Sequence, residues 1–373
     1  MRFGISIKKY ESMFTNGCVQ QGLFIHKMLN FIPNIRCDFV TVEPGYTCFD
    51  KLAPIEVTLL TEESIKKYDI IGSLSLTLGE NSCKHILHWL KKYKIKYVDI
   101  LCGNLFVLLQ EEFVFQTHHI MKNYRNSAID EVWVLEMYDY SKEFLELVYN
   151  KPVKVLKYVW DTDIIRKYIT EKNVVQFKGT DNSKINICVF EANMSLHKNA
   201  FVPLLIAERF YRKYPDKLNK VYIFCKENMK NNGYYEHMNI VRNGKIEFVG
   251  RMIMPSALQI IQNTNSYRNV VLSYTHMNNL NFLHLELLYL GVPIIHNCEP
   301  FQNGYYYNSE NVKEAVQLLE KARLSMIRPI DNIEILCKFN CKNADIQTNW
   351  KDNIDRICDF EFPPIGTTTL EKA

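Results

Sequence analysis

Short runs of β-branched and aliphatic residues alternate with segments whose apolar positions recur at helical spacing, almost throughout the chain. Alternation of this kind is typical of βαβ units, in which crossover helices join parallel strands. In the first half the pattern predicts strands over residues 3–7, 38–42, 55–60, 69–74, 96–101 and 131–135, and helices over 18–30, 80–92 and 141–150.

A second series of the same kind begins near residue 153. It predicts strands over 153–159, 185–191, 220–226, 246–250, 270–274 and 292–296, and helices over 199–212, 255–263, 279–290 and 309–322. The polar segment 176–184 is rich in turn-forming residues and is predicted to form a hinge between the two halves. Residues 343–360 are predicted to form a last amphipathic helix with Trp350 on its apolar face.

Two series of βαβ units predict an α/β protein with two Rossmann-like, doubly wound domains facing a central cleft. We place the domains at 1–155 and 156–335, and a helical tail at 336–373. The apolar face of the tail needs a surface to bury, and we expect the tail to return to the N-terminal domain. Ligands of open α/β sheets bind beyond the carboxyl ends of the strands, so site residues are expected in the strand-to-helix loops.

Composition excludes several classes of protein. Hydrophobic residues make up 47% of the 373 residues and charged residues 23%, which excludes global disorder. The net charge of +4 is too small to indicate nucleic-acid binding by itself. The 11 cysteines are scattered without a CxxC pair, which favours a reducing compartment. No apolar run approaches the ~20 residues of a membrane span, so we expect a cytoplasmic protein.

Two loops carry residues suited to bind an anion. Gly17 lies just before the first long helix, where glycine lets the backbone approach a ligand and the helix start offers free N–H groups. This loop does not match GxGxxG, so no nicotinamide cofactor is expected. The loop after strand 185–191 contains Asn193, Ser195 and Lys198, and the lysine would supply a positive charge to a diphosphate.

The segment from residue 273 to 297 is the most informative part of the chain. Its polar loop offers four candidate binding residues, namely Thr275, His276, Asn278 and Asn279. The helix that follows carries one acid, Glu286, among leucines, and it ends at a Gly-Val-Pro turn. A carboxylate on an apolar helix needs a hydrogen-bond donor, and the diol of a ribose would provide one.

These motifs resemble the donor-binding domain of GT-B glycosyltransferases. The resemblance rests on the segment 245–251, which ends in Arg251, on the strand near 269–274, and on the Glu-Leu-Leu-Tyr-Leu-Gly-Val-Pro run that starts at Glu286. The resemblance of the motifs extends over about residues 185–322. Over residues 1–150 only the predicted arrangement of strands and helices is similar. The segment around Glu286 also resembles a poorly characterised branch of viral and bacterial proteins, which would place a viral chain in the host cytoplasm.

The resemblance implies transfer of a sugar from a nucleotide-sugar donor, such as a UDP- or GDP-sugar, to a glycan, protein or other hydroxyl acceptor. No further cofactor is implied. Lys198 falls where the family places a basic residue on the diphosphate, and Glu286 matches the second acid of the family's E-x7-E motif. The first acid falls on Asn278, which leaves the retaining or inverting course open.

The catalytic base is expected on the first domain, facing the donor. His118 and His119 are the candidates that we select, with Glu111 and Glu112 nearby. The triplet at residues 161–163, Asp-Thr-Asp, matches the manganese motif of the GT-A fold. Because it stands where a helix should begin, we interpret Asp161 as an N-cap and predict no metal site.

Three alternative functions remain open at this stage. A nucleotide-sugar epimerase can share the GT-B shape, and a glycosyltransferase can act on a DNA base, although nucleic acid is the less favoured partner. A degenerate module that binds a nucleotide sugar without turnover is the third, because Asn278 replaces an acid.

Overall fold

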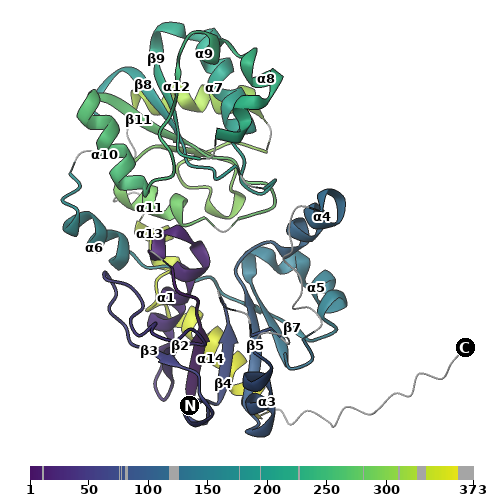
Figure 1. Cartoon of the computed structure of the whole chain (residues 1–373). Helices are drawn as coiled ribbons and strands as arrows, with labels where there is room; N and C mark the ends of the chain where they lie inside the picture. Colours follow the sequence, from purple (N-terminus) through teal and green to yellow (C-terminus); the bar gives the residue numbers. More distant parts are fainter. Residues whose placement is uncertain are drawn as a thin grey trace, which may run out of the picture.

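A computed structural model describes residues 1–359 of the chain except 11, 75, 77, 80–82, 117–125, 176, 194, 226, 280, 310 and 326–332. Figure 1 shows two α/β domains, one above the other, with the chain crossing between them near α6 (Asp163–Glu171) and again near α13 (Ile333–Lys338). Each domain is built on one sheet whose strands all pair in parallel, so helices must cover both faces of the sheet.

The first sheet has seven strands in the order β3-β2-β1-β4-β5-β6-β7. The strands are β1 (Arg2–Ser6), β2 (Arg36–Thr41), β3 (Val57–Leu59), β4 (Ile70–Ser73), β5 (Lys96–Leu101), β6 (Glu131–Leu135) and β7 (Val153–Leu156). The helices of this half are α1 (Gly17–Leu29), α2 (Glu62–Ile65), α3 (Lys84–Lys92), α4 (Leu105–Phe115) and α5 (Lys142–Tyr149). The strand order reverses between β1 and β4, and binding crevices form at such a switch point.

The second sheet has six strands in the order β10-β9-β8-β11-β12-β13. They are β8 (Asp181–Val189), β9 (Leu218–Ile223), β10 (Ile246–Phe248), β11 (Tyr267–Leu272), β12 (Ile294–His296) and β13 (Tyr305–Tyr306). Its helices are α7 (Phe201–Lys213), α8 (Gly233–Glu236), α9 (Asn239–Arg242), α10 (Met254–Thr264), α11 (Phe282–Leu290) and α12 (Val312–Leu324).

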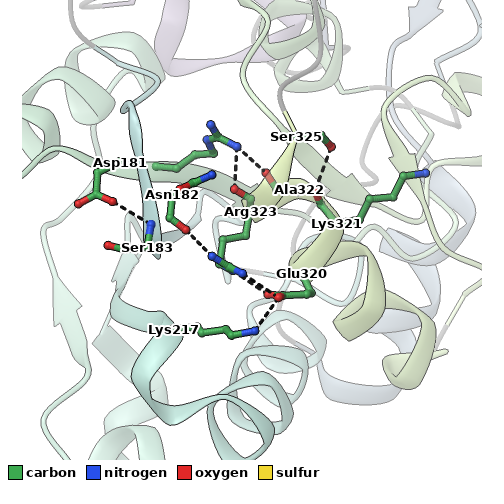
Figure 2. Close-up of polar contacts among 10 residues, drawn as sticks. Asp181, Asn182, Ser183, Lys217, Glu320, Lys321, Ala322, Arg323 and Ser325 are labelled. Atoms are coloured by element: carbon green, nitrogen blue, oxygen red, sulfur yellow. Dashed lines mark hydrogen bonds and ion pairs between the residues drawn. The ribbon is translucent and has the colours of Figure 1, made fainter.

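Polar contacts fasten α12 to the edge of the second sheet where its strands begin (Figure 2). The Arg323 guanidinium donates to the Glu320 carboxylate and to the carbonyl oxygen of Asn182 at the start of β8. Lys217 also donates to Glu320, at 2.7 Å. This cluster therefore belongs to the scaffold, because it lies at the end of the sheet opposite to the strand-to-helix loops.

The chain returns to the first domain after the second is complete. α13 (Ile333–Lys338) contacts α11, and α14 (Ala344–Asp359) packs against α1 and β7. The Trp350 indole nitrogen donates to the Lys157 carbonyl oxygen at 2.9 Å, and its ring meets Trp133 of β6 edge to face at 6.0 Å. Arg356 forms two hydrogen bonds of 2.6 Å with the buried Glu131 carboxylate. The predicted return of the tail to the N-terminal domain is confirmed.

Three expectations from the sequence need correction. The strand predicted at 153–159 is β7, which pairs with β6 in the first sheet rather than opening the second series. The end of the predicted hinge, from Asp181 on, belongs to β8. The pattern also missed two helices, α4 and α6 (Asp163–Glu171). For α4 the reason is that its apolar positions form no clear helical stripe.

Candidate functional site

A cavity of about 480 Å³ lies between the two domains, at the carboxyl ends of both sets of strands. Residues from the loops after β1, β5, β8, β9, β10 and β11 line it together with the N-terminal halves of α1 and α11. Five of the residues predicted from the sequence line this cavity, namely Gly17, Lys198, Arg251, Asn278 and Glu286. Residues from opposite ends of the chain thus meet at one site.

The other predicted binding residues lie close to the cavity but not among the residues that line it. Asn193 accepts from the backbone N–H of Ala200, and Ser195 contacts the His197 ring, so both shape the loop that carries Lys198. Thr275, His276 and Asn279 belong to the loop before α11; the backbone N–H of His276 donates to the His197 carbonyl oxygen at 2.8 Å. These residues therefore shape the loops beside the cavity, and their contact with a donor stays a prediction.

The predicted catalytic histidines, His118 and His119, lie outside the described residues. Glu111, the acid named beside them, is buried on α4 and accepts from the backbone N–H of Leu196. That hydrogen bond makes Glu111 a contact between the domains, and Glu111 does not line the cavity.

Lys198 is half-buried at the end of the β8–α7 loop and lies beside a buried acid, Glu191. Burial lowers the pKa of Lys198, and the Glu191 carboxylate opposes this effect. Burial also raises the pKa of Glu191, while Lys198 and a hydrogen bond from the Ser273 hydroxyl oppose it. The cavity wall therefore places a lysine beside an acid, with burial acting against the charge of both, and an anionic ligand would favour the charged form of the lysine.

Glu191 was quoted in the sequence motif but not selected as a site residue. It follows directly after β8 and is 1% exposed. Ser273 bridges it to His284, whose Nε2 lies 3.2 Å from the serine oxygen. Since the serine donates to Glu191, the histidine Nε2–H donates to the serine. Burial holds the pKa of His284 well below its usual value.

Glu286 lies on α11 with its side chain buried against the cavity. Burial raises the pKa of Glu286 to about 8, and the side chain of Gln20 on α1 partly opposes this rise. Gln20 is 5% exposed, and its amide nitrogen makes no hydrogen bond of regular geometry among the described residues. The Glu286 carboxyl and the Gln20 amide therefore lie close together in the cavity wall, where both groups are available to a polar ligand.

The start of α1 forms part of the opposite wall. Asn16 caps the helix by accepting from the backbone N–H of Cys18 at 2.9 Å. The Cys18 thiol contacts Cys102, which follows β5, and this contact together with the nearby Lys198 lowers the pKa of Cys18 against the effect of burial. Neither cysteine was predicted as a site residue. Cys102 lies directly after β5, however, at the end of a strand where site residues are expected.

The DxD triplet lies away from this cavity. The Asp161 carboxylate accepts from the backbone N–H of Asp163 at 2.8 Å, at the first turn of α6, and both acids form ion pairs with Lys27. Asp161 therefore acts at the start of a helix, one residue before the assigned N-cap at Thr162. Within the described residues, no three His, Cys, Asp or Glu side chains are grouped so as to hold a metal ion.

The fold and the position of the cavity define the class to which the protein belongs. It has the GT-B fold, as the sequence predicted: a solved structure of the lipopolysaccharide outer core galactosyltransferase WaaB superposes with a TM-score of 0.57, covering 96% of this chain and 100% of that one at 12% identity. Within that fold, the chain belongs to the family described as a protein of unknown function (DUF2827), whose model matches residues 3–337.

Two further solved structures are similar at a lower level. UDP-GlcNAc 2-epimerase from Methanocaldococcus jannaschii has a TM-score of 0.48 at 13% identity, covering 97% of this chain and 100% of that one. T4 phage BGT in complex with its UDP-glucose substrate has a TM-score of 0.48 at 12% identity, covering 96% and 100%. No curated protein matches the sequence. Among the described helices, none has the length and apolar character needed to cross a membrane.

Proposed function

We propose that the protein is a glycosyltransferase that moves a sugar from a nucleotide-sugar donor, such as a UDP- or GDP-sugar, to a hydroxyl acceptor. Support comes from the cavity, which combines two cations, Lys198 and Arg251, with the start of α1 and the buried Glu286. Cations and a helix start suit a diphosphate, and a carboxylate suits the two hydroxyls of a ribose. The single observation that carries the proposal is the meeting of Lys198 and Glu286 in one interdomain cavity of a GT-B fold.

The proposed reaction is independent of a metal ion. Lys198, Arg251 and the α1 start would stabilise the charge that develops on the departing nucleoside diphosphate, which is the task that a metal performs in other transferases. The general base would come from the first domain, and His118 and His119 remain the predicted candidates. A glycan or a protein would supply the acceptor hydroxyl, and the WaaB galactosyltransferase of the same fold offers a glycan precedent.

A second candidate function is binding of a nucleotide sugar without turnover. Asn278 stands where the resembling family carries an acid, and its side-chain oxygen accepts from the Tyr138 hydroxyl instead of pointing a charge into the cavity. The described residues of the first domain that line the cavity also include no carboxylate, histidine or lysine. Both observations fit a site that holds its ligand and lacks a strong base.

The test is to incubate the full chain with UDP-, GDP-, ADP- and CDP-sugars and to measure release of free nucleotide, with and without EDTA. Slow release without an acceptor, unaffected by EDTA, is expected for the transferase. A change of the sugar's configuration with the donor retained would identify an epimerase, and glucosylation of added DNA would identify a DNA-base transferase. Tight binding without any release over hours would favour the non-catalytic module, and no binding of any nucleotide sugar would refute the proposal.

A further inference from the structure

Two loops of the second domain meet the first domain through polar contacts, and both carry residues of the cavity. The first loop, 193–199, carries Lys198; the second, 275–279, carries Asn278. The two loops also touch each other, because the backbone N–H of His276 donates to the His197 carbonyl oxygen. We call them the donor loops, in keeping with the proposed function on which this inference rests.

Asn104 of the first domain contacts both donor loops. It is 1% exposed in the turn between β5 and α4. Its carbonyl oxygen lies 2.9 Å from His197 Nε2 in the first donor loop. Its side-chain amide donates to the Met277 carbonyl oxygen in the second donor loop. The same side chain caps α4 by accepting from the backbone N–H of Val107 at 3.3 Å, so the residue is fixed to its own domain.

The chemistry of these contacts fixes their direction. A carbonyl oxygen only accepts, so His197 must carry its proton on Nε2, and Nδ1 then accepts from the Ser195 hydroxyl at 3.2 Å. Burial lowers the pKa of His197, which agrees with a neutral ring. The loop that carries Lys198 is thus ordered by one chain of hydrogen bonds that begins at Asn104.

Neighbours of Asn104 complete the contact. Tyr140 donates to the Met277 carbonyl oxygen at 2.9 Å, and Tyr138 donates to the side chain of Asn278. Glu111 accepts from the backbone N–H of Leu196. Met277 itself has a φ of +47°, a left-handed conformation that costs energy for a residue other than glycine and persists only when its surroundings hold it. The donor loops are therefore held in place from the opposite domain.

We propose that Asn104 is a positioning residue: from the first domain it fixes both donor loops and so sets the place of Lys198 in the cavity. Asn104 does not itself line the cavity. Binding of a nucleoside diphosphate then depends on a residue of the acceptor-side domain, because separation of the domains would release both loops at once.

The test uses two matched substitutions. Asn104→Asp keeps the oxygen that caps α4 but replaces the amide donor with a carboxylate oxygen that faces the Met277 carbonyl. Asn126→Asp is the control: Asn126 is also buried, donates to the Leu78 carbonyl oxygen at 2.8 Å and accepts from the backbone N–H of Ala128, all within the first domain. Both variants lose one buried amide donor, but only the first touches the second domain.

Hydrogen exchange of the unliganded chain, read by mass spectrometry, gives the first measurement. Asn104→Asp is expected to speed exchange in segment 275–279 by about tenfold, the effect of roughly 1.4 kcal/mol of lost hydrogen bonding. The substitution keeps the main-chain carbonyl that contacts His197, so segment 195–199 should respond less, through its hydrogen bond with His276. Asn126→Asp should leave both segments unchanged. Equal exchange in these segments for the two variants would overturn the proposal. Tyr138→Phe, which removes only a hydroxyl, should speed exchange in 275–279 alone and serves if Asn104→Asp does not fold.

Calorimetric titration with UDP and GDP gives the second measurement. Whichever diphosphate the parent binds should bind Asn104→Asp about tenfold more weakly, and Asn126→Asp as well as the parent. Unchanged affinity in Asn104→Asp would show that the loops are held in place without consequence for the site, against the proposal. If the parent binds neither diphosphate while exchange responds as expected, the proposed function fails and the role of Asn104 in holding the loops stands.

Discussion

The two walls of the interdomain cavity are made of different groups. Among the described residues, every carboxylate, lysine and arginine that lines it belongs to the second domain, namely Glu191, Lys198, Arg251 and Glu286. The first domain contributes the start of α1, the Gln20 amide, and thiols. Charge for binding a ligand thus resides on one wall, while the other wall supplies neutral polar groups and, through Asn104, support for the loops opposite.

This division has a physical advantage for a two-domain site. Neutral hydrogen bonds contribute about 1 kcal/mol each, so the walls can meet and separate at small cost. A pair of opposite charges buried between the domains would cost several kcal/mol to break once its partner was removed. If the proposed function holds, the second domain would supply the affinity for a charged donor, and the first domain would keep the binding loops ordered.

Glu286→Leu should have the largest effect on this division. Loss of the carboxyl group removes hydrogen bonds to a ribose diol, each worth roughly 1.5–3 kcal/mol in the charged form, so nucleotide affinity measured above pH 8, where Glu286 is ionised, should fall at least about 100-fold. The buried carboxyl would also be gone, and the melting temperature should rise. Glu286→Gln, the matched variant, should weaken binding less and keep the shape. If calorimetry gives the leucine variant the same nucleotide affinity as the parent, Glu286 does not bind the nucleotide.

Lys198→Ala should have the next largest effect. A charge-assisted hydrogen bond to a diphosphate is worth roughly 1.5–3 kcal/mol, so affinity should fall by about 10- to 100-fold. Lys220→Ala is the control, because Lys220 lies in the same domain and donates to the Gly244 carbonyl oxygen away from the cavity. Equal affinities for the two variants would remove Lys198 from the site.

The pKa of Glu286 predicts a dependence of stability on pH. Its folded-state value of about 8 exceeds the ordinary value of 4.5, so the folded protein holds a proton that the unfolded chain releases. This contribution is complete below pH 4.5 and is lost as the pH rises to 8. The parent should therefore lose on the order of a few kcal/mol of unfolding free energy relative to Glu286→Gln over this window. Urea unfolding of both proteins at pH 5 and pH 8 measures this loss. The same change in unfolding free energy for the parent and for Glu286→Gln would contradict the raised pKa of Glu286.

Asn278→Asp should have the smallest effect. It tests a residue of the second domain whose side chain contacts the first domain. The Asn278 oxygen already accepts from the Tyr138 hydroxyl, so a carboxylate oxygen fits the same place without disturbing the fold. Nucleotide affinity should change less than in Lys198→Ala. A large rise in donor turnover, followed by nucleotide release, would instead show that the acid missing from this position is what limits catalysis.

Much of the fold could be predicted because periodicity reports burial. Parallel strands buried on both faces produce continuous apolar runs, as in Val270 to Leu272, and the amphipathic stripe around Trp350 required a covering surface. Position at the end of a strand also located Gly17, Lys198 and Glu286, because local order in an α/β chain determines which loops gather at one edge. The helix α4 escaped prediction because it is apolar on all sides.

What only the tertiary structure decided concerns contacts between distant segments. Nothing in the sequence predicted a role for Asn104, and Glu111 was expected near the catalytic base. Both become contacts between domains because α4 and the turn before it lie beside the donor loops. Gln20 lies beside Glu286 although 266 positions of the chain separate them, and Asp161 forms an ion pair with Lys27. Charge, periodicity and strand order are local properties that the sequence determines by itself. The partner of each polar group depends on how the two domains meet, and that follows only from the packing of the whole chain.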